Sequence, residues 1–397
     1  MNKNRLVYLL GLAGFIVMAD NWVVSPILPA IAGNLGVDVA QAGLLITAYM
    51  IPFGVFQLLF GPLADRFGKK QVILFSVLAF TVATGLCALG SSLTGLAVFR
   101  ALTGVFAAAV MPISLAMIGD EFPMQERQSA IGTFMGISFL GQGLSMAIGG
   151  TIAYLLDWRG VFAVYAAFSI LPAVLLLANY RKLPSTKHPD SKFLAPYGKL
   201  LGTRRSLFTY LVVLLEGLFI VGGFSYVGAY IAKTYGFNFL TIGLIMTAFG
   251  VLTVIGGRVS SKLAARFGAR NVLTFGLASA AAADLLIFFF GGTLPLLVLS
   301  VALLGAGFIF THSTLLTRAT EFAQKARGAA MSLVAFFFMG GGGIGTALGG
   351  RIVAASSLST LYLVYGIALI VALALSFVLI RDRVVEPDEN KEEIGNL

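Results

Sequence analysis

Residues 61–70 read Gly-Pro-Leu-Ala-Asp-Arg-Phe-Gly-Lys-Lys, and residues 261–270 read Ser-Lys-Leu-Ala-Ala-Arg-Phe-Gly-Ala-Arg. The two stretches share Leu-Ala, Arg-Phe and Gly at an offset of 200 residues. The same offset relates further pairs: Gly43-Leu44 and Gly243-Leu244, Glu121-Phe122 and Glu321-Phe322, Arg127 and Arg327, and Gly149-Gly150 and Gly349-Gly350. One register held through several loops and helices indicates two similar halves in direct order.

The composition indicates that lipid covers most of the chain. Of the 397 residues, 58% are hydrophobic and 11% are charged, whereas soluble domains carry about 25% charged residues. The net charge of +10 does not indicate a nucleic-acid binder, because the basic residues fall between apolar spans. We therefore expect an all-α polytopic membrane protein.

Apolar runs bounded by charged clusters predict twelve membrane-spanning helices, since about 20 apolar residues cross a bilayer. The predicted spans are 6–32, 41–63, 71–90, 94–117, 128–154, 160–180, 206–232, 239–263, 271–291, 294–317, 328–354 and 359–380.

The basic residues predict the orientation of these spans. With an even number of spans, 23 of the 27 Lys and Arg residues lie on the side of the termini and three on the other side. Positive residues accumulate in cytoplasmic loops. We therefore expect both termini in the cytoplasm and the protein in a bacterial inner membrane.

The predicted organisation is a six-helix half at 1–180, a polar linker at 181–205, a second half at 206–383 and a cytoplasmic tail at 384–397. Two parallel six-helix repeats are the arrangement of one large class of secondary transporters, in which substrate binds between the halves.

The loop at 61–70 resembles the signature loop of the major facilitator superfamily, and the resemblance of the whole chain covers residues 5–383. The resemblance implies the fold of that family and a conformational switch made by Gly61, Asp65, Arg66, Gly68 and Lys69. The second copy has Ala265 in place of Asp65. This difference predicts that the switch belongs mainly to the first half.

Two charged residues are predicted to couple transport to protons. Arg100, in Val98-Phe99-Arg100-x3-Gly104, resembles the helix 4 motif of proton-coupled members, and Asp20, followed by Pro29, resembles the first-helix motif of drug exporters. Burial disfavours the ionised carboxylate and an adjacent cation favours it. We expect Asp20 to carry the proton and Arg100 to set its affinity; the alternative is a permanent ion pair that fixes helix packing.

Small residues at intervals of four predict close helix packing or gating in the fifth and eleventh spans. They are Gly141, Ser145 and Gly149 in the fifth span, and Gly341, Gly345 and Gly349 in the eleventh. The fifth span resembles the Gly-Pro motif of antiporters, but Gly141-Gln142-Gly143 replaces the proline.

The remaining polar groups of the spans are candidates for substrate contacts, because intramembrane ionisable residues are functional candidates by default. We expect the substrate site to contain Glu216, Asn21, Trp22, Gln142 and His312, with Glu216 attracting cationic substrates. We interpret Asp284 as a structural residue of a peripheral helix.

The closest resemblance is to the twelve-helix drug:proton antiporters. It implies efflux of lipophilic or cationic small molecules by a monomer that needs no cofactor beyond the coupling proton. Two alternatives remain: export or flipping of lipid-like amphiphiles, and proton-coupled uptake of a nutrient. A membrane sensor or enzyme is disfavoured, because the sequence has no catalytic constellation, and with Cys87, His188 and His312 as its only Cys and His residues it lacks the ligands of a typical metal site.

Overall fold

The computed structural model describes residues 2–184, 195–323 and 327–379, and in these ranges the regular elements are all helices. The first half contains α1 (Lys3–Trp22), α2 (Val24–Leu35), α3 (Val39–Ala42), α4 (Leu44–Phe67), α5 (Lys69–Ala88), α6 (Leu93–Ala107), α7 (Val110–Glu121), α8 (Met124–Leu155), α9 (Trp158–Ala178) and the short η1 (Tyr180–Lys182). The linker forms the helix α10 (Ala195–Gly202).

The second half contains α11 (Arg204–Glu216), the π-helix η2 (Gly217–Val221), α12 (Gly222–Phe224), α13 (Val227–Tyr235), α14 (Phe239–Phe267), α15 (Ala269–Phe290), α16 (Leu294–Glu321), α17 (Arg327–Ala355) and α18 (Leu358–Leu379). Several predicted spans consist of two or more of these elements. The described chain has twelve helical segments long and apolar enough to cross a membrane, so the predicted number of spans is confirmed.

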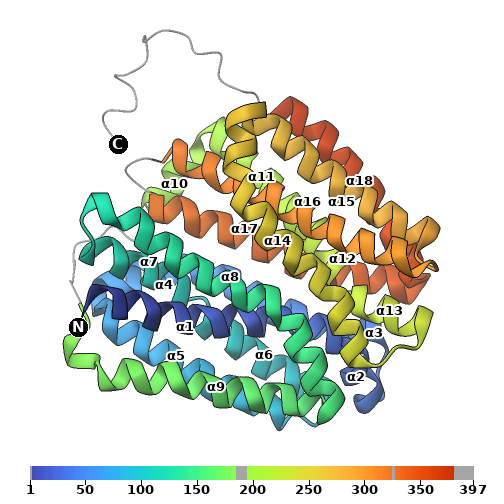
Figure 1. Ribbon diagram of the computed structural model, residues 1–397, viewed down its shortest axis with the longest axis horizontal. Coiled ribbons are helices and arrows are strands. Elements are labelled where there is room, and N and C mark those ends of the chain that lie inside the picture. Colours follow the sequence, from blue (N-terminus) through green and yellow to red (C-terminus); the bar gives the residue numbers. More distant parts are fainter. Residues whose placement is uncertain (1, 185–194, 324–326, 380–397) are drawn as a thin grey trace.

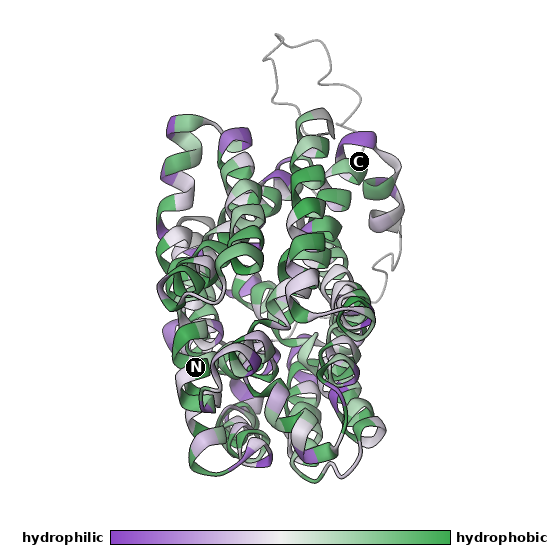
Figure 2. Cartoon of the chain, turned by 90° about the vertical axis from the view of Figure 1, so that its right-hand side faces the viewer, coloured by the Kyte–Doolittle hydropathy of each residue, from purple (hydrophilic) through white to green (hydrophobic). Residues whose placement is uncertain are grey.

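The two halves form adjacent bundles whose helices run in roughly the same direction (Figure 1). Apolar residues predominate along these helices (Figure 2). We call the end of the molecule at which α1 begins the N-terminal side, and the end at which α2 and α13 finish the far side. α18 returns the chain to the N-terminal side.

Four glycines show that the sequence repeat is also a structural repeat. Gly36 and Gly236 have φ of 65° and 64°, and Gly68 and Gly268 have φ of 104° and 86°. Side chains with a β-carbon rarely adopt such angles, so glycine allows the tight turn at each position. Each pair is 200 residues apart, which places the same turns in both halves.

The first helix of each half is also interrupted. Val23 separates α1 from α2, and Pro26 explains the break because it has no N–H to donate to the carbonyl of Trp22. In the second half, the break at Ser225 and Tyr226 separates α12 from α13.

Close packing joins the two halves on the far side. Ser25 Oγ donates to the carbonyls of Phe224 and Ser225 at 2.8 and 3.1 Å, and Thr47 Oγ1 donates to the carbonyl of Gly343 at 2.9 Å. A β-carbon on Gly250 of α14 would lie 2.5 Å from the carbonyl oxygen of Gly143 in α8. The backbones therefore touch across this seam, and the far side is closed.

The small residues of α8 pack as expected against the first span. A β-carbon on Gly141 would overlap the carbonyl of Phe15, and one on Gly149 would overlap the Val23 side chain. Ser145 is buried and donates to the carbonyl of Gln142 at 2.8 Å. Close approach is thus confirmed for Gly141 and Gly149.

The glycines of α17 pack against the seventh span. A β-carbon on Gly341 would overlap the carbonyl of Leu214, and one on Gly345 would overlap the carbonyl of Leu218. Gly349 lies against the rings of Tyr226 and Tyr365. In contrast, a β-carbon on Gly340 would meet no atom within 4 Å. The glycine run therefore contains both close-contact and open positions.

These contacts predict opposite effects of alanine within one glycine run. Gly345→Ala should destabilise the protein by about 1–3 kcal/mol, because the added methyl group overpacks the backbone of Leu218. Gly340→Ala, the matched control, should stabilise it by up to about 1 kcal/mol, because alanine favours the helix and the space is empty. The measurement is the unfolding temperature of the purified protein, with transport rate alongside. Equal unfolding temperatures of the two variants would contradict the packing argument.

Candidate functional site

A cavity of about 490 Å³ lies between the two halves. α1, α4, α7 and α8 of the first half and α16 and α17 of the second half line it. The wall extends to Thr320 and Gly328 on the N-terminal side, and Gly328 is exposed. The cavity therefore opens toward the N-terminal side, opposite the closed seam.

The wall of this cavity is mostly apolar. Five of the chain's 11 methionines line it: Met18, Met111, Met135, Met331 and Met339. Its aromatic residues are Trp22, Phe53, Phe139, Phe308 and Phe338, and its polar side chains are Gln57, Gln142, His312, Thr320 and Ser332. Methionine is unbranched and polarizable, so such a wall can adapt to ligands of different shapes.

An aromatic cluster closes the inner end of the cavity. The Trp22 ring lies 5.4 Å from Phe224, 5.5 Å from Phe249 and 5.9 Å from Phe308, measured between ring centroids. Because the carbonyl of Phe224 also accepts a hydrogen bond in the far-side seam, the aromatic cluster connects the cavity to this seam.

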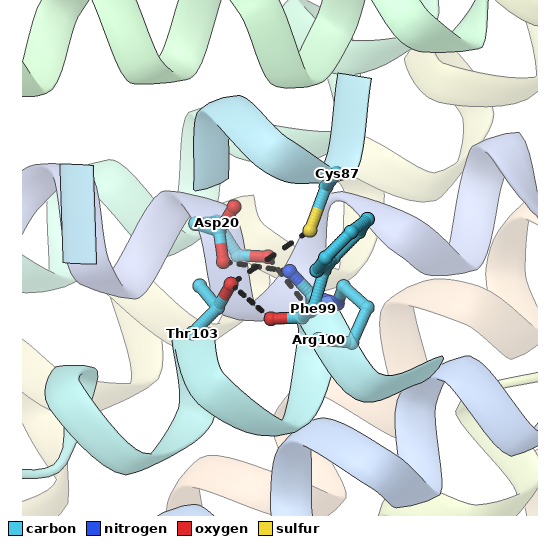
Figure 3. Close-up of polar contacts among 5 residues, drawn as sticks. All are labelled: Asp20, Cys87, Phe99, Arg100 and Thr103. Atoms are coloured by element: carbon cyan, nitrogen blue, oxygen red, sulfur yellow. Dashed lines mark hydrogen bonds and ion pairs between the residues drawn. The ribbon is translucent and has the colours of Figure 1, made fainter. Parts of the chain in front are cut away.

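Asp20 and Arg100 form a buried ion pair in the first half (Figure 3). The two side chains are 0% and 1% exposed, and Arg100 Nη1 donates to Asp20 Oδ2 at 2.8 Å. Cys87 and Thr103 lie beside the pair, with their Sγ and Oγ1 atoms 3.7 Å apart. The expected proximity of Asp20 and Arg100 is confirmed, and their role in proton coupling stays a prediction.

Aromatic rings complete the surroundings of the guanidinium. Arg100 Cζ lies 4.3 Å from the ring centroid of Tyr49 and 5.7 Å from that of Phe162, and such contacts stabilise a desolvated cation. Asp20 Oδ1 has no hydrogen-bond partner in the described ranges. One carboxylate oxygen is thus satisfied by Arg100, and the other is available to a proton.

Glu216 pairs with His312 instead of lining the cavity. It ends α11, directly before the π-helix η2, and is fully buried. His312 Nδ1 lies 3.2 Å from Glu216 Oε1, and the imidazole ring stacks on Phe308 and lies tilted against Phe338 on the wall. Glu216 is not one of the wall residues, and His312 lies between it and the cavity; its expected role toward cationic substrates stays a prediction.

The other predicted contact residues divide between the wall and its surroundings. Trp22, Gln142 and His312 are on the wall. Asn21 is not part of the wall; it is buried, and its Nδ2 lies 4.0 Å from the Met339 sulfur.

The signature loop lies on the N-terminal side, between α4 and α5. Lys69 is buried, and its Nζ lies 2.5 Å from Asp120 Oδ2 and 3.9 Å from Asp65 Oδ1. Gly68 forms the turn. Arg66 is exposed. A β-carbon built on Gly61 would meet no atom of a neighbouring helix within 4 Å, so no other helix approaches closely at this position.

Sequence reasoning missed several residues around these groups. Nothing in the sequence pointed to Tyr49 or Phe162 as neighbours of Arg100, because aromatic residues are common in all spans. Asp120 follows an apolar run and could have been identified as a partner for a buried lysine. Asp284, interpreted as structural, is completely buried.

The chain matches the model of the Major Facilitator Superfamily over residues 10–317 and 218–396. It is 27% identical to the uncharacterized MFS-type transporter YceJ of Bacillus subtilis (strain 168), over 85% of this chain and 86% of that protein. It is 35% identical to the puromycin resistance protein pur8 of Streptomyces alboniger, but over 43% of this chain and 34% of that protein. It is 24% identical to multidrug resistance protein 3 of Bacillus subtilis, over 78% of this chain and 58% of that protein.

Solved structures share the fold. The nucleoside transporter NupG superposes with a TM-score of 0.75 at 15% identity, covering 96% of this chain and all of NupG (100%). An inward-facing bacterial homolog of the lysosomal transporter Spinster superposes with a TM-score of 0.75 at 19% identity, covering 95% and 96% of the two chains. With two halves of six helices around a cavity and a family match along nearly its whole length, this chain belongs to the major facilitator superfamily of membrane transporters.

Proposed function

We propose that this transporter exports lipophilic small molecules, cationic ones among them, in exchange for protons. The observation that carries the proposal is the buried Asp20–Arg100 pair, which lies directly behind the cavity wall. Met18 and Trp22 of the first span face the cavity, whereas Asp20 between them contacts Arg100 of α6. A movement of this span would therefore change both the substrate surface and the ion pair.

Coupling follows from the cost of burying charge. An unpaired carboxylate in a low-dielectric interior is unfavourable, so separation of Asp20 from Arg100 favours uptake of a proton on the carboxylate. Re-forming the pair expels the proton. A substrate that shifts the first span toward the paired arrangement of Asp20 and Arg100 would then be exchanged for a proton.

The apolar wall and the named relatives support lipophilic substrates. Its methionines and aromatic rings suit compounds of varied shape. Relatives are named for resistance to puromycin and to multiple drugs. The same wall would also accept a lipid-like amphiphile, which is our second candidate; nutrient uptake is the less favoured alternative, because the described wall has only five polar side chains.

The proposed location is a bacterial inner membrane, with the protein acting as a monomer. The excess of Lys and Arg on the N-terminal side supports a cytoplasmic position for that side. The cavity then opens to the cytoplasm, and this conformation is the one that would receive substrate for export.

Asp20→Asn should abolish substrate-driven proton release. The amide keeps the shape of the carboxyl group but cannot exchange a proton, and because it leaves the Arg100 charge uncompensated, the unfolding temperature is measured alongside. The measurement is proton release from purified protein in weakly buffered detergent on addition of tetraphenylphosphonium, a lipophilic cation. Asp38→Asn, which alters an exposed acid on the far side, is the control and should behave like the wild-type protein. Undiminished release by Asp20→Asn would remove this residue from the proton path.

Asp65→Asn should slow transport about tenfold or more while leaving the affinity for tetraphenylphosphonium nearly unchanged. Asp65 lies 3.9 Å from Lys69 at the junction of α4 and α5, away from the cavity wall, so its loss should alter the interconversion of states. Transport into inverted vesicles and equilibrium binding would separate the two quantities. A large loss of affinity with normal turnover would refute a switching role.

Glu216→Gln should weaken binding of tetraphenylphosphonium about tenfold, or roughly 1.4 kcal/mol, and spare triphenylphosphine oxide, a neutral probe of similar shape. The reason is that the Glu216 carboxyl group lies directly behind His312 of the cavity wall and supplies the acidic group nearest to a bound cation. His312→Gln, which keeps the carboxylate, is the control and should retain the preference for the cation. Equal losses for both probes in Glu216→Gln would indicate a proton-carrying or structural role.

A further inference from the structure

Asp284 of α15 is a buried carboxyl group that the proposed cycle does not use. It is 0% exposed, and neither of its carboxylate oxygens has a hydrogen-bond partner in the described part of the chain. A β-carbon on Gly223 of α12 would lie 3.6 and 3.7 Å from these two oxygens. The carboxyl group therefore packs against the seventh span, next to the residues of the far-side seam.

The pocket around Asp284 is the counterpart of the pocket around Asp20. In the first half, Tyr165 of α9 donates to the carbonyl of Ser145 at 3.5 Å. In the second half, Tyr365 of α18 donates to the carbonyl of Gly345. Tyr365 and Gly345 lie 200 residues after Tyr165 and Ser145, so the repeat preserves this interaction.

The second aromatic position of each pocket is also equivalent. Phe162 lies against Arg100 in the first half. Its counterpart Tyr362 interacts with Asp284 in the second half and donates to the carbonyl of Gly223 at 3.4 Å. Each half therefore buries one acid near these two equivalent aromatic positions: Asp20 of the first span, whose partner Arg100 contacts Phe162, and Asp284 of α15 in the second half.

The two pockets differ in their cations. Ser300 occupies the position equivalent to Arg100, and its hydroxyl donates to the carbonyl of Leu296. The titratable groups near Asp284 are Tyr362 and Tyr365 of α18 and Tyr230 of α13, whose hydroxyl donates to the carbonyl of Ile287 in α15 at 3.2 Å.

Other helices bring no cation to this carboxyl group. On α14 and α16, which pack against α15, the described charged or titratable side chains all lie in the N-terminal-side half of each helix: Arg258, Lys262, Arg266, His312, Arg318 and Glu321. Lys233 of α13 is exposed at the far end. No ion pair to Asp284 is present in the ranges that the structure describes.

We propose that Asp284 is a second proton-binding site, occupied while the far side is closed and emptied when it opens. This inference rests on the proposed proton-coupled function and adds a carrier in the second half. An ionised carboxylate that is completely buried and has no partner is strongly disfavoured, so in the closed state the group is a neutral carboxylic acid.

The position of Asp284 makes its protonation depend on whether the far-side seam is closed. Its neighbour Gly223 precedes Phe224 and Ser225, whose carbonyls accept the hydrogen bonds from Ser25 of the first half. Opening this seam admits water beside the carboxyl group. The O–H bond then breaks, the proton passes to water, and the bonding electrons stay on the carboxylate. Closure expels water and requires the proton to return.

Infrared spectroscopy tests the protonation directly. In Asp20→Asn/Glu216→Gln, Asp284 is the remaining acid in the interior of the described spans. This double variant should show the carbonyl band of a neutral carboxylic acid at pH 7, where exposed carboxyl groups are ionised. Adding Asp284→Asn should remove the band. Absence of the band in the double variant, or its persistence in the triple variant, would overturn the assignment.

Transport in liposomes tests the coupling. Protons moved per tetraphenylphosphonium, measured with a pH-sensitive dye, should fall in Asp284→Asn and stay unchanged in Ser279→Ala, a buried polar residue on the same helix. An unchanged ratio in Asp284→Asn would overturn the carrier role. Failure of the proposed function is distinguishable, because the wild-type protein would then move this probe without protons, whereas the infrared band does not depend on transport.

Discussion

Arg100 has no bulk water to solvate it, and the arrangement of the first half follows from that constraint. Its charge is neutralised by Asp20 of the first span and covered by the rings of Tyr49 from α4 and Phe162 from α9. Four spans therefore meet around one guanidinium group. Removal of a partner would leave a buried charge uncompensated, which is far more costly than the loss of an exposed ion pair. The pair thus fixes which faces of these helices pack together.

Contact between the halves is governed by sterics instead of charge. In lipid, apolar side chains gain little by leaving the membrane, so helix association depends on close packing and interhelical hydrogen bonds. The seam at Gly143 and Gly250 brings backbone against backbone, and Ser25 adds hydrogen bonds to the seventh span. Such contacts cannot be stretched gradually. The far side is therefore either sealed or open, which suits movement of each half as a unit.

Much of this architecture could be predicted from the sequence, because lipid imposes strong patterns. The number of spans and the repeat follow from apolar length and the 200-residue offset. The need to neutralise a buried charge predicts a partner for Arg100, and the family resemblance, which places the first and fourth spans side by side, identified it as Asp20. Side-chain direction within a span could not be predicted, because helices that are apolar on all faces carry no periodic signal. For this reason the sequence did not show that His312 separates Glu216 from the cavity, or that Asp284 is completely buried.

The ionisable groups stand one layer behind an apolar wall, and this separation has a consequence for specificity. Asp20 lies on the side of the first span that faces Arg100 and not the cavity, and His312 lies between Glu216 and the cavity. A substrate touches mainly methionine and aromatic side chains, whose adaptable surfaces discriminate weakly among shapes. The free energy of proton binding is then coupled to movement of whole spans and not to a particular hydrogen bond with the ligand. One coupling mechanism can therefore serve chemically different substrates, because each need only fill the cavity and shift the same helices.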